Sequence, residues 1–81
     1  MEKAIRLKVK KDLGPREQAN IIKLKGSLIS RGYTEIIHIS DQDEEYHINT
    51  FETSGERLNE VHQFISAFIS RENLSDTLFI N

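Results

Sequence analysis

Residues 3–10 read Lys-Ala-Ile-Arg-Leu-Lys-Val-Lys, and the order of these side chains decides the interpretation of the whole chain. Ile5, Leu7 and Val9 take every second position, with charged side chains between them. Successive side chains of a β-strand point to opposite faces of a sheet, so this alternation predicts a strand with one buried face. Such a strand needs a covering layer of other elements on its apolar side.

A helix is expected after this strand, over residues 15–31. Pro15 suits the first turn of a helix, and Gly32 suits the left-handed position that ends one. The apolar positions with helical spacing are Ile21, Ile22, Leu24, Leu28 and Ile29. Lys25 falls inside this stripe, which leaves two interpretations. Either its stem lies along the helix edge, or Ile22 and Ile29 lie partly outside the core.

Two more strands are expected at residues 33–39 and 45–51, because both stretches are rich in β-branched and aromatic side chains. The segment between them, residues 41–44, is polar and predicts a hairpin loop. We expect a register with Ile39 opposite Tyr46, which places the even-numbered side chains of the third strand on the buried face.

A second helix and a short last strand complete the chain. Residues 53–56 read Thr-Ser-Gly-Glu, which has the spacing of a helix capping box. The apolar stripe that follows consists of Leu58, Val61, Ile65, Phe68 and Ile69. Asn73 suits the end of this helix, and Leu78 and Ile80 alternate as in a strand.

The element order βαββαβ predicts an α+β fold in which two helices cover one face of a four-stranded antiparallel sheet. The simplest arrangement of this two-layer sandwich resembles the ferredoxin-like plait, with strand order 4-1-3-2. That topology carries many unrelated activities, so it does not itself indicate a function. We expect residues 1–81 to form a single domain.

Composition excludes several classes of protein. The 81 residues include no cysteine, which excludes disulfide scaffolds, thiol catalysis and cysteine-based zinc sites. No apolar run approaches the roughly 20 residues of a membrane span, and we expect a cytoplasmic protein without a membrane partner. The chain shows no nucleophile–base order and no cofactor motif. These absences favour a non-catalytic domain without metal or cofactor, although they leave the question of an activity open.

Charge is distributed unevenly behind a net value of −2. Residues 1–31 carry nine basic and three acidic side chains, whereas residues 32–81 carry two basic and ten acidic ones. This split indicates either a polyanion partner or pairing between the two halves. The polar tip at 41–45 and the basic end of the first helix are expected about 10 Å apart, which favours partial neutralisation within the molecule.

The sheet face away from the helices is the predicted partner surface. The residues expected there for partner binding are Ile36, His38, His47, Phe51 and Phe79. Several large apolar side chains on one open face form a patch of a size that often marks an interface. We therefore expect a small interaction or regulatory domain that binds a protein partner, or a second copy of itself as a dimer.

Binding of RNA or single-stranded nucleic acid is the alternative. Arg6, Lys8, His47 and Phe51 are expected on the open face, whose layout resembles the base-stacking sheet of RNA-recognition motifs. A further anion site is expected at the start of the first helix, where free N–H groups attract negative charge. The basic residues of these two regions are Arg6, Lys8, Lys10, Lys11 and Arg16.

His38 and His47 would face each other across the predicted hairpin. Cross-strand side chains lie about 4.5–5.5 Å apart at Cβ, close enough for two imidazoles to share a metal. A zinc site needs at least three protein ligands, and no third ligand is expected on that face. We therefore predict a metal-free histidine pair.

Overall fold

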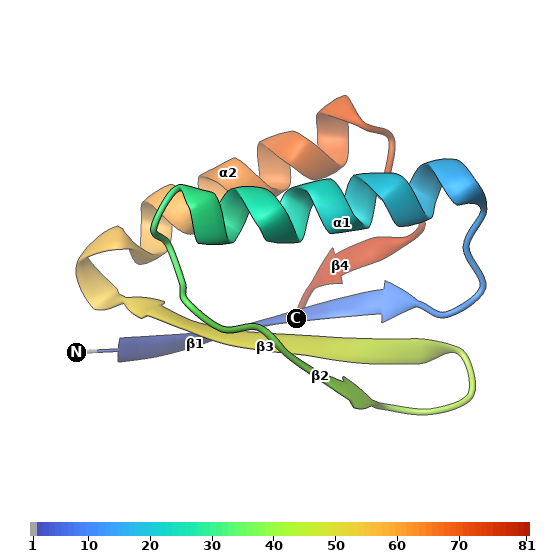
Figure 1. Ribbon diagram of the computed structural model, residues 1–81, viewed down its shortest axis with the longest axis horizontal. Helices are drawn as coiled ribbons and strands as arrows, with labels where there is room; N and C mark the ends of the chain where they lie inside the picture. Colours follow the sequence, from blue (N-terminus) through green and yellow to red (C-terminus); the bar gives the residue numbers. More distant parts are fainter. Residues whose placement is uncertain (1) are drawn as a thin grey trace.

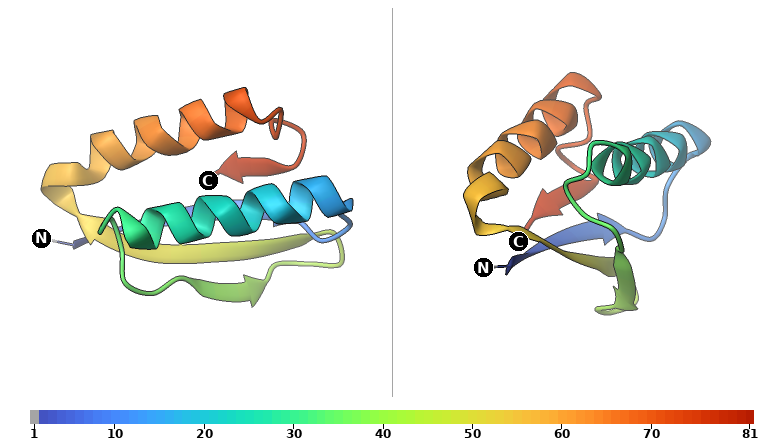
Figure 2. Two further views of the ribbon diagram at one scale, coloured as in Figure 1. Left: turned by 45° about the horizontal axis from the view of Figure 1, so that its top comes forward. Right: turned by 60° about the vertical axis from the view of Figure 1, so that its left-hand side comes forward.

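The computed structural model describes residues 2–81 and shows two layers, with both helices on one face of an antiparallel sheet (Figure 1). The elements in chain order are β1 (Glu2–Lys10), α1 (Pro15–Ser30), β2 (His38–Asp41), β3 (Tyr46–Ser54), the short 3₁₀ helix η1 (Gly55–Arg57), α2 (Leu58–Arg71) and β4 (Leu78–Ile80). The helices lie side by side above the sheet (Figure 2). The predicted α+β class, with four antiparallel strands and two helices, is confirmed.

The strands are hydrogen-bonded in the order β2-β3-β1-β4, which reads 4-1-3-2 when counted from the opposite edge. The alternating stretch forms β1, in the middle of the sheet between β3 and β4. Ile5, Leu7 and Val9 are buried beneath the helices, as the alternation predicts. The two outer strands are short, with four residues in β2 and three in β4.

Helix α1 buries a narrower stripe than its sequence suggests. Ile21, Leu24 and Leu28 are buried, whereas Ile22 is 70 % exposed and Ile29 is 46 % exposed. Of the two interpretations of Lys25, the one that leaves both isoleucines partly outside the core is therefore confirmed.

The end of α1 explains why the segment after it is not a strand. Gly32 has φ +76°, its N–H bonds to the Ile29 carbonyl, and the Tyr33 N–H bonds to the Leu28 carbonyl. This is a Schellman ending, in which the residue after the glycine closes the helix. The predicted strand over residues 33–39 therefore begins five residues too early, because Tyr33 belongs to the helix end and β2 begins only at His38.

Helix α2 starts and ends close to the expected places. The cap is Ser54, whose Oγ accepts from the Glu56 N–H at 3.2 Å, so the predicted cap at Thr53 is one residue too early. Thr53 lies in β3 and is buried. Asn73 has φ +56° and ends α2 as expected.

The predicted register of β2 and β3 is wrong by three residues. Ile39 lies opposite Asn49 instead of Tyr46. An odd shift moves every side chain to the other face. Figures 1 and 2 show β3 between β1 and β2. The odd-numbered side chains of β3 therefore lie on the same face as those of both neighbouring strands.

Two causes account for this register. The Asp43 carboxylate accepts the N–H groups of Glu45 (2.8 Å) and Tyr46 (2.9 Å), which makes the hairpin loop longer than expected. The larger and wholly apolar Phe51 then lies in the core opposite Ile5, where it is 1 % exposed.

Candidate functional site

The five residues predicted to bind a partner lie in three places. Ile36 and His38 line a groove at the edge of β3, together with the buried ring of Phe51 at its floor. Phe79 is 37 % exposed and lies opposite Lys8, on the sheet face away from the helices. His47 lies opposite Val9 on the helix-covered face. The expectation that these side chains share one surface, with Phe51 exposed on it, is therefore wrong.

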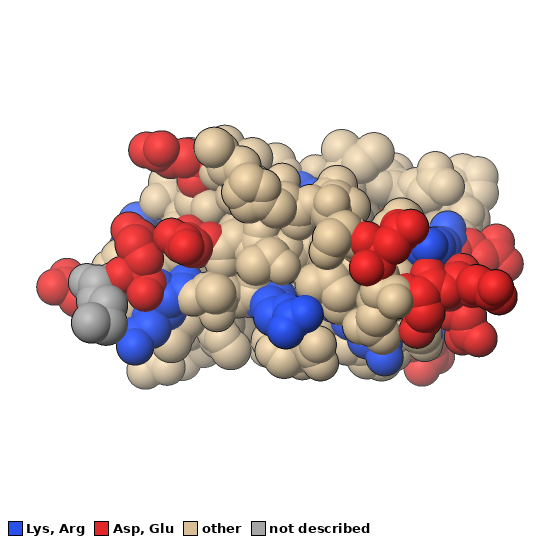
Figure 3. All heavy atoms as spheres, turned by 90° about the horizontal axis from the view of Figure 1, so that it is seen from below, with Lys and Arg blue, Asp and Glu red and all other residues tan. Residues whose placement is uncertain are grey.

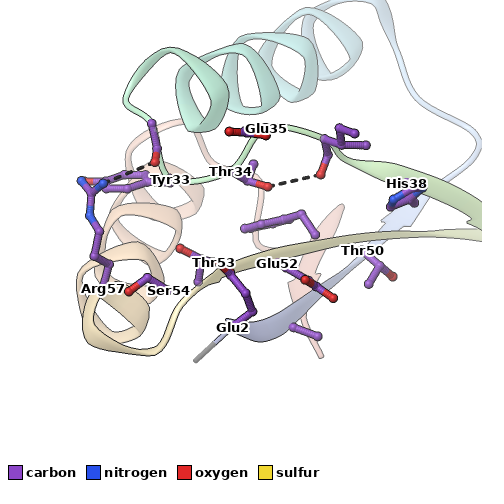
Figure 4. A pocket seen from close by; sticks show the side chains of 14 residues that line it. Glu2, Tyr33, Thr34, Glu35, His38, Thr50, Glu52, Thr53, Ser54 and Arg57 are labelled. Carbon is purple, nitrogen blue, oxygen red and sulfur yellow. Dashed lines mark hydrogen bonds between the residues drawn. The ribbon is translucent and has the colours of Figure 1, made fainter.

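The groove, called the β3 groove below, runs between the segment 32–38 and the second half of β3 (Figure 4). Its volume of about 590 Å³ is within the range of known ligand sites. The Thr34 hydroxyl donates to the Ile36 carbonyl at 3.2 Å, which folds the segment on itself instead of along the strand. The lining consists of Glu2, Ala4, Gly32, Tyr33, Thr34, Glu35, Ile36, His38, Thr50, Phe51, Glu52, Thr53, Ser54 and Arg57.

The backbone of β3 is unpaired along this groove. The Tyr46 carbonyl accepts from Gln42 on the β2 side, whereas the Glu45 carbonyl accepts from Lys11 on the β1 side. Because these directions alternate along an antiparallel strand, Thr50 and Glu52 face the β2 side. The ladder with β2 ends at Thr50. Among residues 2–81, no backbone partner reaches Glu52 from that side.

Thr53 adds a second unsatisfied group to the groove. The residue is 1 % exposed, and its Oγ1 has no hydrogen-bond partner within the described chain. A buried hydroxyl without a partner costs about 1–3 kcal/mol of stability. The groove therefore has backbone groups at its edge that can still form hydrogen bonds, and a buried hydroxyl beneath them that has no partner in the described chain.

Carboxylates dominate the charge of the β3 groove. Glu2, Glu35 and Glu52 line it, and all three are exposed. The cationic Arg57 already has three partners: it donates to the Gly32 carbonyl at 3.3 Å, pairs with a Glu60 oxygen at 3.5 Å, and its guanidinium lies 4.6 Å from the centre of the Tyr33 ring. The groove is therefore complementary to positive charge.

Tyr33 and Glu60 hold one wall of the groove in place. The Tyr33 hydroxyl donates to Glu60 Oε2 at 2.7 Å. This hydrogen bond is the main reason why the pKa of Glu60 is lowered, with the charge of Arg57 adding to it. The Tyr33 ring is buried and packs 5.8 Å from the ring of Phe64.

The open face, defined as the even-numbered side chains of β1, β2 and β3 with Phe79 of β4, carries a row of cations. Arg6, Lys8 and Lys10 follow one another along β1. Lys8 Nζ lies 4.2 Å from the centre of the Tyr46 ring, and that ring meets Phe79 edge-on at 6.3 Å. Figure 3 shows basic side chains between acidic groups at both ends of this face.

The nucleic-acid surface predicted from sequence is only partly assembled there. Arg6 and Lys8 lie on the open face as expected, but His47 and Phe51 face the helices. Tyr46 occupies the open face in their place, a residue that the wrong register had put in the core.

The predicted anion site at the start of α1 is occupied by internal contacts. Lys11 Nζ pairs with Asp41 Oδ1 at 3.4 Å, which confirms the expected pairing between the basic and acidic regions. Arg16 pairs with Glu17 at 3.3 Å and donates to the Glu72 carbonyl. Lys11 and Arg16 therefore already have partners, whereas Lys10, the third cation predicted there, has no carboxylate within salt-bridge distance among residues 2–81.

A second hollow, called the α1 cleft below, lies between α1 and the β2–β3 strands. It has a volume of about 270 Å³. Its lining consists of Val9, Lys10, Lys11, Leu13, Gln18, Ile21, Ile22, Lys25, Ile39, His47 and Asn49. Asn49 is 2 % exposed, and its Oδ1 has no partner in the described chain. The sequence-based predictions do not include this hollow, although an amide in the middle of an apolar strand is a signal for it.

The predicted histidine pair does not form. His38 lies opposite Thr50, and His47 lies opposite Asp41, with 3.2 Å between His47 Nδ1 and Asp41 Oδ1. Within residues 2–81, no three His, Asp or Glu side chains gather closely enough to hold a metal ion.

The hydroxyl groups of the structure make structural hydrogen bonds. In the described chain, the Ser and Thr hydroxyls that donate do so to backbone carbonyls, and none donates to a histidine or a carboxylate. Both hollows contain charged side chains and polar groups without a partner in the described chain. Neither α1 nor α2 has the length and apolar character needed to cross a membrane.

Comparison with known proteins returns no relatives: no protein family, curated protein or solved structure matches this chain.

Proposed function

We propose that this chain is a non-catalytic interaction domain, built as a ferredoxin-like plait, which binds a short extended segment of a protein partner in the β3 groove. The observation that carries this proposal is the unpaired backbone of Glu52 beside a hollow of about 590 Å³. An extended peptide can add to an exposed sheet edge through main-chain hydrogen bonds.

The geometry limits the length and strength of the interaction. From Phe51 to Ser54 the strand spans roughly 10 Å, because each step along a strand adds about 3.3 Å. A segment paired there forms about two hydrogen bonds to Glu52. Each contributes on the order of 1 kcal/mol, so the two hydrogen bonds alone correspond to a dissociation constant of roughly 30 mM, and tighter binding depends on the charge and side-chain contacts of the segment.

Charge selects the segment. Glu2, Glu35 and Glu52 surround the groove, and Arg57 is held by its own partners. Complementary charge increases association rates and disfavours wrong partners. The preferred partner is therefore a basic segment, whose alternate side chains would reach the three carboxylates.

A titration of the ¹⁵N-labelled domain with two synthetic peptides tests this proposal. The first is an eight-residue peptide of alternating lysine and valine, and the second has glutamate in place of lysine. We expect only the basic peptide to bind, with the largest shifts at Thr50, Glu52 and Ser54. Binding of the acidic peptide with equal affinity, or shifts confined to other elements, would contradict the proposal.

Two variants at one position separate backbone pairing from charge. Glu52→Pro removes the N–H that faces the groove, and proline is tolerated at a strand edge because this N–H takes no part in the pairing with β1. Glu52→Gln removes only the charge. We expect a several-fold loss of affinity for Glu52→Gln and at least a tenfold loss for Glu52→Pro, with β1–β3 cross-strand signals intact in both. Equal affinities for the two variants would show that the Glu52 N–H takes no part in binding.

Single-stranded nucleic acid is a second candidate ligand, favoured by the row of three cations on β1 beside Tyr46 and Phe79. Stacking of a base on such a ring contributes about 1–3 kcal/mol. With three phosphate contacts, the slope of log K against log salt would be about −2. Lys8 already covers the Tyr46 ring and would have to move.

A labelled oligonucleotide titrated at low salt checks this candidate. Binding should be lost in a Tyr46→Ala, Phe79→Ala double variant and kept in Ile36→Ala, because Ile36 lines the β3 groove and lies away from these rings. If the oligonucleotide does not bind at domain concentrations of tens of micromolar, nucleic acid is rejected as the ligand and the protein segment remains.

A further inference from the structure

We propose that the α1 cleft binds a small organic anion with an apolar body. This site shares no residue with the β3 groove and does not depend on the function proposed for it. Its walls, its unpaired amide and its charge point to the same class of ligand.

The walls supply apolar contact that the folded chain leaves uncovered. Ile22 of α1 is 70 % exposed and Ile39 of β2 is 58 % exposed, and both line the cleft. Leu13 and the buried Ile21 and Val9 complete the apolar surface. A ligand with a flat or branched hydrocarbon body would cover these side chains from water.

Asn49 supplies the polar anchor. It lies between Leu7 and Ile39 in the register of the sheet, on the face beneath the helices. Buried polar side chains are almost always hydrogen-bonded, so an amide without a partner at the floor of a cleft calls for one. The oxygen and nitrogen of the amide exchange places with little change of shape. The unpartnered atom is the acceptor Oδ1, so binding of an oxyanion requires the amide to turn and place its NH₂ group toward the cleft as the donor.

The charge of the lining selects an anion. Three lysines and His47 line the cleft, and its described lining contains no Asp or Glu. Lys11 and His47 both approach Asp41, whereas Lys10 and Lys25 have no carboxylate within salt-bridge distance among residues 2–81. Burial lowers the pKa of Lys25, and a bound carboxylate would offset that desolvation.

The size of the cleft limits the ligand to a small molecule. Its volume of about 270 Å³ is slightly below the range of about 300–1,000 Å³ found for drug-sized ligands. A single aromatic or short aliphatic carboxylate fits this volume, whereas a protein helix does not.

Naphthalene-2-carboxylate is a suitable probe, with the uncharged 2-naphthylmethanol as its matched control. We expect the carboxylate to bind at least tenfold more tightly than the alcohol. In ¹⁵N and methyl spectra, the Asn49 side-chain amide and the methyl groups of Ile22 and Ile39 should shift together. Equal affinities for the two probes, or shifts elsewhere, would overturn the inference.

Variants assign the contributions of single side chains. Asn49→Leu keeps the branching at Cγ and removes the amide, and we expect at least a tenfold loss of affinity for the carboxylate. Lys25→Met should lose several-fold, whereas Lys23→Met, an exposed lysine on the same helix outside the cleft, should bind as the wild type does. Unchanged binding in Asn49→Leu would show that solvent alone satisfies the amide. Binding only to an acidic peptide would equally contradict a small-molecule site.

Discussion

The β3 groove and the α1 cleft both border the short strand β2, yet they differ in charge. The groove is lined by three carboxylates, and the cleft by three lysines and a histidine. Thr53 in the groove and Asn49 in the cleft are both buried and have a side-chain oxygen without a hydrogen-bond partner in the described chain. The uneven charge of the sequence is thus divided between two hollows that are lined by side chains of opposite charge.

The largest expected effect concerns the floor of the β3 groove. Phe51→Ala removes a ring that is 1 % exposed, and such substitutions cost about 3–5 kcal/mol. Phe79→Ala, on the open face, should cost below about 1 kcal/mol. Denaturant unfolding of both variants measures the difference. Similar losses for the two would contradict the observed register and return Phe51 to the open face.

The two unpaired polar groups should respond in the same direction to apolar replacement. Thr53→Val and Asn49→Leu each remove a buried group whose lack of a partner costs about 1–3 kcal/mol, so we expect each to raise the free energy of unfolding by about 1 kcal/mol. Thermal unfolding is a sufficient measurement. A loss of stability in either variant would show that the native group has a hydrogen-bond partner in solution.

The smallest expected effect concerns Asp43, in the hairpin loop that sets the register of β2 and β3. We expect this residue to change how the free energy of unfolding depends on pH in acid. Hydrogen bonds from the backbone N–H of Glu45, and then from Gln42 and Tyr46, lower the pKa of Asp43. The folded state therefore binds this proton less readily than the unfolded chain does. Its contribution is present above the unfolded pKa of about 3.9 and is lost as pH falls through the lower folded value.

Asp43→Asn should consequently flatten the pH dependence of the melting temperature below about pH 4. Asp76→Asn, an exposed carboxylate outside the loop, is the control and should retain the wild-type slope. An unaltered slope in Asp43→Asn would argue against the hydrogen bonds from Glu45 and Tyr46 to its carboxylate.

The sequence predicts the frame of the fold better than its sites. The alternation over residues 3–10 and the helix-end signals Gly32 and Asn73 are local, and all three predictions are confirmed. The face of β3 is not a local property. Tyr46 and Phe51 have opposite parity, so either set of side chains could fill the core, and the Asp43 turn decides between them.

The β3 groove also depends on contacts between residues that are far apart in the sequence. The sequence predicts Ile36 and His38 as exposed partner residues, and both line the groove. The groove itself exists because Tyr33 closes α1, which takes the following segment out of the sheet. The Tyr33 ring packs against α2, and this long-range contact favours the helix end over a strand at Tyr33.

The unpaired backbone at Glu52 also bears on self-association and aggregation. Two copies that joined edge to edge around this residue in antiparallel fashion would place their Glu52 carboxylates directly opposite each other, where like charges destabilise a strand pair. A charged side chain on a free edge is a common protection against such pairing. Glu52 would then keep the domain monodisperse near neutral pH. Acid, which neutralises carboxylates, would allow sheets of neighbouring molecules to join and the protein to precipitate.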